Sequence, residues 1–163
     1  MKPALRTENR KHHNHARCVV QALKDAKTLC RGKGLNLTPV RLRVLELVWA
    51  GHEPAKAYDI IERFSKARHA TKPPTVYRAL DFLLEHGFIH RIESENAFIG
   101  CPRPITKHEG KFFICESCNR VTEIDSRRVN STIEKLASEN GFRIHTKTVE
   151  IFGLCAACAG KKN

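Results

Sequence analysis

The sequence predicts an α+β protein in which an N-terminal winged helix-turn-helix domain is followed by a small α/β domain that zinc holds together. Short amphipathic helical patterns fill the first half of the chain and end in a predicted β-hairpin. A proline-rich break follows at residues 101–104. Beyond it, two Cys-x-x-Cys pairs flank a pattern of strands and one helix, which is typical of a domain built around a structural metal.

Composition limits the partners of the chain. Its 163 residues are enough for one domain or two small ones, and 29 Lys and Arg against 17 Asp and Glu give a net charge of +12. This excess favours a polyanionic partner, either nucleic acid or an anionic membrane surface, without choosing between them. The N-terminus has no apolar signal segment and no stretch is long enough to span a membrane, so we expect a cytoplasmic protein.

The first element is a basic tail over residues 1–15 with almost no apolar periodicity, which predicts a mobile terminus. It contains a cluster of imidazoles at His12, His13 and His15. These side chains are either solvated or weak metal ligands, and nothing nearby in the sequence would fix a ligand geometry.

A helix is expected from Ala16 to about Arg31, because apolar residues recur there on one helical face. The pattern on this face comprises Val19, Val20, Leu23, Ala26, Lys27 and Cys30. Cys18 and Cys30 lie about 18 Å apart along such a helix, so they cannot form a disulfide with each other.

Further helices and a hairpin complete the winged helix over residues 16–100. Thr38 and Pro39 predict a helix start, and a short amphipathic helix follows at 57–64. The clearest helical pattern begins at residues 71–74 and is closed by Gly87. Two alternating stretches, 88–92 and 97–99, surround a predicted turn and form the wing.

Residues 101–107 are expected to form a hinge, because the prolines there continue neither a strand nor a helix. The second domain, residues 108–163, then shows strand patterns at 111–115 and 121–124. A helix is expected from about Ser126 to Asn140, followed by a strand over 142–151.

The two cysteine pairs are Cys115 with Cys118 and Cys155 with Cys158. Two intervening residues allow both thiolates of a pair to reach one ion, and two pairs complete the tetrahedral shell that structural zinc prefers. Disulfides are the alternative, but they need an oxidising compartment. Without a signal segment, the pattern favours zinc.

The predicted helix closed by Gly87 is a candidate DNA-recognition helix, because the second helix of a helix-turn-helix enters the major groove. Arg78 lies on its polar face and can bond guanine O6 and N7, while Thr75 and Tyr77 can contact phosphate or a thymine methyl group. The same residues also fit an ordinary solvated helix face.

A second set of potential metal ligands surrounds the hinge: His90, Cys101, His108 and Glu123. Imidazole, thiolate and carboxylate together suit four-coordinate zinc. Taken singly, each of these residues also has an ordinary structural explanation.

Three segments carry a resemblance to a known family. The run Pro73 to Phe88, the pair Cys115-x-x-Cys118 and the run Gly153 to Cys158 closely resemble the ferric uptake regulator family, and most closely its zinc-sensing members. The resemblance implies a homodimeric, metal-dependent repressor that binds a palindromic operator in double-stranded DNA. It also implies that residues 108–163 form the dimerisation domain.

Carried over by position, the resemblance assigns one structural and one regulatory zinc ion to each chain. The structural site falls on Cys115, Cys118, Cys155 and Cys158, and the regulatory site falls on His90, Cys101, His108 and Glu123. An iron- or peroxide-responsive regulator of the same family is the nearest alternative. A zinc enzyme lacks support because no His-Glu-x-x-His motif is present, and an RNA-binding module remains open.

Overall fold

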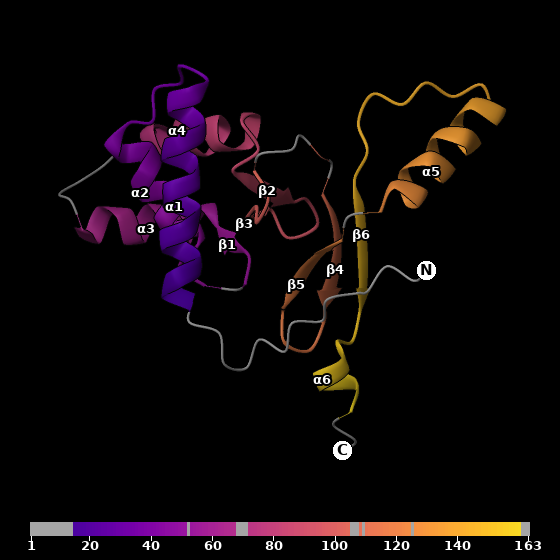
Figure 1. Ribbon diagram of the computed structural model, residues 1–163. Helices are drawn as coiled ribbons and strands as arrows, with labels where there is room; N and C mark the ends of the chain where they lie inside the picture. Colours follow the sequence, from indigo (N-terminus) through magenta and orange to yellow (C-terminus); the bar gives the residue numbers. More distant parts are fainter. Residues whose placement is uncertain are drawn as a thin grey trace.

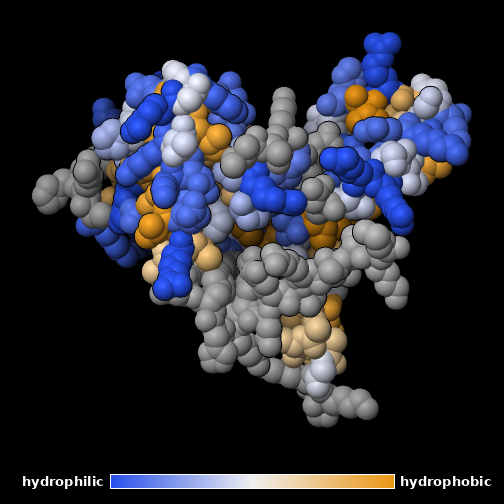
Figure 2. Space-filling model, in the orientation of Figure 1, coloured by the Kyte–Doolittle hydropathy of each residue, from blue (hydrophilic) through white to orange (hydrophobic). Residues whose placement is uncertain are grey.

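The computed structural model describes residues 15–51, 53–67, 72–104, 108, 110–124 and 126–160, which fold into a helical half and a sheet-containing half that lie side by side (Figure 1). In the same view, hydrophilic side chains cover most of the helical half, whereas apolar colour reaches the surface near the C-terminal end (Figure 2). None of the described helices combines the length and apolar character needed to cross a bilayer.

The helical half has the predicted winged-helix architecture. Its elements are α1 (His15–Gly32), α2 (Pro39–Val48), β1 (Ala55–Lys56), α3 (Ala57–Ala67), α4 (Pro73–Glu85), β2 (Ile89–Ile92) and β3 (Ala97–Gly100). The predicted start of α2 is confirmed, since the Thr38 side chain accepts a hydrogen bond from the Arg41 N–H. Gly87 follows α4 with φ 72°, a left-handed conformation that favours glycine.

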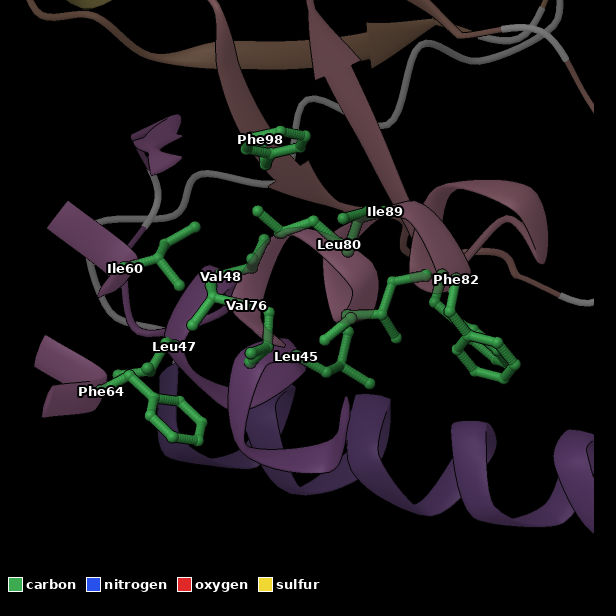
Figure 3. Packing of buried hydrophobic residues seen from close by; sticks show 14 of the residues in the cluster. Leu45, Leu47, Val48, Ile60, Phe64, Val76, Leu80, Phe82, Ile89 and Phe98 are labelled. Carbon is green, nitrogen blue, oxygen red and sulfur yellow. The ribbon is translucent and has the colours of Figure 1, made fainter. Parts of the chain in front are cut away.

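One hydrophobic core joins the helices and the wing (Figure 3). Val44 of α2 and Val76 and Leu83 of α4 are completely buried at its centre, and Ile89 and Phe98 reach it from the wing. Because α4 buries this face, its opposite face, with Thr75, Tyr77 and Arg78, stays in solvent. The fold therefore presents the predicted recognition residues outward.

The wing differs from the predicted hairpin by one additional strand. β1 pairs antiparallel with β3, with Ala55 opposite Phe98, so the sheet order is β1-β3-β2. A strand of two residues is too short to show the alternation of apolar and polar residues that indicates a strand in a sequence. Its pairing with β3 is therefore what identifies it.

The C-terminal half contains β4 (Lys111–Cys115), β5 (Val121–Ile124), α5 (Arg127–Glu139), β6 (Val149–Gly153) and α6 (Ala156–Ala159). Its sheet has the order β5-β4-β6, with β5 antiparallel and β6 parallel to β4. The predicted strand over 142–151 is wrong at both ends, because β6 pairs with β4 only between Lys111↔Val149 and Cys115↔Gly153. The five residues of β4 thus set the extent of β6, and the preceding chain serves as the crossover.

Helix α5 begins where predicted, with the Ser126 side chain accepting from the Val129 N–H, but none of its residues is buried. In Figure 1 it stands away from the sheet, so it does not cover the sheet as a compact α/β unit would require. A second difference concerns α1, where Val20 of the predicted apolar stripe is 65% exposed.

A second, smaller hydrophobic cluster connects the two halves. Ile92 and Ile99 of the wing pack with Phe112, Ile114 and Val121 of the C-terminal sheet. Because these side chains come from both halves, the wing and the sheet share buried apolar surface, which favours their contact.

Candidate metal centres and nucleic-acid interface

The four cysteines of the two Cys-x-x-Cys pairs converge at the lower end of the C-terminal sheet. Cys115 ends β4, and Cys118 lies in the turn that follows it. Cys155 is the N-cap of α6, and Cys158 lies within that helix. Their sulfur atoms all lie within 4.8 Å of one another. All seven cysteines of the chain are free thiols, and the 3.8 Å between the Cys118 and Cys155 sulfurs is far longer than a disulfide bond of about 2.05 Å.

Backbone N–H groups favour the thiolate form of Cys115 in this cluster. The Cys155 N–H donates to Cys115 Sγ at 3.3 Å, and chiefly this hydrogen bond lowers the pKa of Cys115 to about 6. The Arg120 N–H lowers the pKa of Cys118, but the Cys115 side chain and burial outweigh it and raise that pKa to about 11. Metals bind the thiolate form, so four sulfurs in this arrangement fit a tetrahedral zinc site.

The second ligand set also converges, and it comes from both halves of the molecule. His90 lies on β2 and Cys101 directly follows β3, whereas His108 precedes β4 and Glu123 lies on β5. Their ligand atoms lie within 4.8 Å of one another. His108 Nε2 is 2.5 Å from Glu123 Oε1 and 3.6 Å from Cys101 Sγ, and His90 Nε2 is 3.4 Å from Glu123 Oε1.

Burial shows that this second cluster fits a cation. The side chains of His90, His108 and Glu123 are 12%, 16% and 8% exposed, and Cys101 is also buried. Among the described residues, His90 Nε2 and Glu123 Oε2 have no hydrogen-bond partner. Buried polar atoms without partners are costly, and a metal ion bound between them would remove that cost.

The local electrostatics make metal binding sensitive to pH. Burial raises the pKa of Cys101 to about 12, so this thiol is protonated at neutral pH without a metal. Burial alone would raise the pKa of Glu123, but the neighbouring imidazoles, His90 first and then His108, lower it. A metal that binds Cys101 as a thiolate must displace its proton, so its affinity rises with pH.

An aromatic ring and a glycine fix the position of His90. The rings of His90 and Phe112 meet edge to face, with centroids 5.5 Å apart. A Cβ atom at Gly110 would lie 2.2 Å from the Phe112 ring and 3.2 Å from His90 Nδ1. This close approach could not be predicted from the sequence pattern, because a glycine beside a predicted strand is common.

The candidate DNA-binding residues form no cluster with the metal ligands. Thr75, Tyr77 and Arg78 are exposed on the first turns of α4. Tyr58, at the start of α3, is 74% exposed, and the sequence interpretation missed it. The signal available was its place outside the apolar pattern of that helix, which has Ile60 and Phe64 on the buried face.

Replacing Gly110 with alanine should weaken metal binding at the His90 cluster by about tenfold or more, a loss typical of disturbed supporting groups. The new methyl group would displace His90 or Phe112, and Phe112 is held in the shared hydrophobic cluster. Zinc titration against a chelator of known affinity measures this change. Gly153→Ala is the matched control, because nothing lies within 4 Å of its Cβ position. Equal affinities of the two variants would contradict the role of Gly110.

The chain is similar to known proteins over most of its length. The family model for the ferric uptake regulator family matches residues 32–152. The zinc uptake regulation protein of Escherichia coli (strain K12) is 40% identical over 141 residues, which cover 85% of this chain and 81% of that protein.

Solved structures show the same similarity. A zinc uptake regulator complexed with zinc and DNA has a TM-score of 0.81 at 39% identity, covering 86% of this chain and 95% of that one. XcZur was solved in two states: the holo form has a TM-score of 0.78 at 41% identity (85% and 97% coverage), and the apo form a TM-score of 0.50 at 38% identity (88% and 99% coverage). The chain belongs to the ferric uptake regulator family.

Proposed function

We propose that this chain is a zinc-responsive transcriptional repressor that binds operator DNA as a homodimer when its regulatory zinc site is filled, and so controls zinc uptake genes. One observation carries the proposal. His90 and Cys101 from the winged-helix half meet His108 and Glu123 from the C-terminal half around one buried point. A metal bound there therefore depends on how the two halves are arranged.

The donor set favours zinc over iron. Cys101 contributes soft sulfur, which selects zinc better than a set of oxygen ligands does. Four protein ligands also leave no open position for a water molecule, so hydrolytic chemistry is not expected. The relatives described above are named as zinc uptake regulators, and one of them was solved with zinc and DNA.

The arrangement of the two halves supports a metal-dependent closed state, in which the wing lies against the C-terminal sheet. At nearly equal sequence identity, this structure is much more similar to the holo form of XcZur than to its apo form. Zinc bound to the four side chains would join the two halves into one rigid unit. The ligands of this chain then hold the wing, and with it α4, in a fixed direction relative to the C-terminal sheet.

DNA binding is assigned to the exposed face of α4. Arg78 would read a guanine edge, and Thr75 and Tyr77 would contact the backbone or a thymine methyl group. Tyr58 is added as a further candidate contact because it is the most exposed large hydrophobic side chain among the described residues. In a dimer, two α4 helices would enter successive major grooves about 34 Å apart on a palindromic operator.

Dimerisation is assigned to the C-terminal half, residues 108–163. Phe113 and Ile151 are register partners on one face of the sheet, and they are 45% and 43% exposed. Strand β6 lies at the edge of the sheet, and α5 leaves Leu136 exposed. Apolar surface together with an unpaired strand edge is typical of a face that a second copy covers.

The predicted division of the chain is kept within this proposal. The winged-helix domain spans residues 16–100, the hinge 101–107 and the dimerisation domain 108–163. Most of the basic tail, residues 1–14, and part of the hinge, residues 105–107, lie outside the described residues, as do His12 and His13. His15 begins α1.

Replacing Cys101 with serine should raise the zinc concentration needed for half-maximal DNA binding by at least about tenfold. The zinc ion that joins the two halves would then lose one of its four protein ligands. The cysteine cluster should still retain about one zinc per chain, since its ligands are separate. Fluorescence anisotropy of a labelled operator in zinc buffers measures the shift. Cys18→Ser on α1 is the control. Unchanged zinc dependence in Cys101→Ser would refute the assigned regulatory site.

Replacing Arg78 with alanine should cost about 1–3 kcal/mol of binding to the operator, and most of this loss should fall on sequence discrimination. Competition between operator and random duplex DNA at fixed salt separates the two effects. Arg143→Ala, an exposed arginine in the C-terminal half, controls for lost charge. An equal loss on both DNAs would make Arg78 a phosphate contact instead.

A further inference from the structure

A carboxylate from the C-terminal half holds the turn of the wing. Glu150 Oε1 accepts a hydrogen bond from the Glu93 N–H at 2.7 Å, and Glu150 Oε2 accepts one from the Ser94 N–H at 3.2 Å. Both oxygens of one side chain therefore bind two consecutive backbone donors. Hydrogen bonds to a charged acceptor are stronger than those between neutral groups.

The place of Glu150 in the sheet aligns this contact with the candidate regulatory site. In the sheet register, Glu123 on β5 and Glu150 on β6 are both partners of Phe112 on β4. Register partners project from the same face of a sheet. One row of side chains thus presents a metal ligand, an aromatic ring that packs against His90 and the carboxylate that binds the wing.

The wing turn is built to receive this carboxylate. Asn96 has φ 48°, and its side chain accepts a hydrogen bond from Arg91, which also pairs with the Glu93 side chain at 3.2 Å. These contacts order the turn and leave the N–H groups of Glu93 and Ser94 to Glu150. Ile92, the neighbouring residue, is fully buried in the cluster shared with the sheet.

We infer that Glu150 is a positioning residue that latches the wing to the C-terminal sheet without a metal, and thereby sets how much zinc the regulatory site needs. His90 lies on the same short strand that leads into the latched turn, so the latch brings it toward Glu123 before any metal binds. A ligand that binds only one conformation has an apparent affinity proportional to the population of that conformation. The link to zinc response rests on the proposed function, whereas the latch itself does not.

The test uses the full chain with its cysteine-cluster zinc retained and compares Glu150→Ala and Glu150→Gln with the natural protein. Glu139→Ala, an exposed glutamate on α5, controls for the lost charge. Amide hydrogen exchange, followed by NMR, reports on the N–H groups of Glu93 and Ser94 with the regulatory site free of metal. Chelator competition gives the zinc affinity of that site, and anisotropy gives operator binding at saturating zinc.

In Glu150→Ala, exchange at both amides should accelerate about tenfold or more, because their acceptor is gone. The zinc affinity of the regulatory site should fall about tenfold, which corresponds to about 1.4 kcal/mol. Operator binding at saturating zinc should change little, since excess zinc restores the closed state. Glu150→Gln keeps one acceptor oxygen and should show a smaller loss in both measurements.

Unchanged exchange at the two amides, unchanged zinc affinity, or protection that arises in the natural protein only after zinc is added would each overturn the latch. Loss of the cysteine-cluster zinc in both variants would also overturn it, because Glu150 would then be a general structural residue. If the natural protein bound DNA without regard to zinc, the proposed function would fail. Faster exchange and weaker zinc binding in Glu150→Ala would still establish the latch.

Discussion

The proposed function depends on one constraint: the four candidate ligands of a single buried cluster belong to two structural units. His90 and Cys101 come from the winged helix, and His108 and Glu123 come from the C-terminal half. Their donor atoms come together only when the wing lies against the sheet. Within the described structure, His90 Nε2 and Glu123 Oε2 make no hydrogen bond, and His90 Nε2 lies 3.4 Å from Glu123 Oε1. Bringing the two halves together therefore has an electrostatic cost, which a bound metal ion would remove. Metal binding and the arrangement of the two halves are thus coupled, as a metal sensor requires.

Other contacts at the same interface also hold the two halves together, and they do not involve a metal. The shared cluster around Ile92 and Phe112 buries apolar surface from both halves, and Glu150 holds the wing turn. Gly110 lets the Phe112 ring approach closely enough to support His90. The wing, which in its fold class is expected to serve DNA recognition, here also docks one domain on the other. The cysteine cluster lies at the opposite end of β4 from His108, and the same sheet carries Glu123 on β5.

The features of the fold and of the candidate sites that depend on neighbouring residues in the chain could be predicted from the sequence. The start of α2 at Thr38 and Pro39, the closure of α4 at Gly87 and the pairing of the two Cys-x-x-Cys motifs each depend on a few adjacent residues. The His90 ligand set was suggested by residue types, but only the family resemblance singled it out. Its members are separated in sequence by the wing, the hinge and a strand, so spacing alone does not bring them together.

The features that could not be predicted depend on distant partners. Strand β6 begins at Val149 because its parallel partner β4 begins opposite it, at Lys111, and β1 exists only as a partner of β3. The predicted α/β domain would place α5 against the sheet, yet none of its residues is buried within the described chain, which fits the proposed contact with a second copy. Glu150 reads as an ordinary strand carboxylate until the wing, more than fifty residues earlier, is placed beside it.

Operator binding in buffered metal solutions measures whether zinc controls DNA binding by this protein. A palindromic duplex, selected from a random library with zinc present, would be titrated with the protein at fixed salt across a series of free zinc concentrations. Parallel series would use ferrous iron and manganese. We predict tight binding that appears only above a threshold of free zinc, in protein that already retains about one zinc per chain in its cysteine cluster. Binding that is indifferent to metal, or that responds to iron alone, would contradict the account.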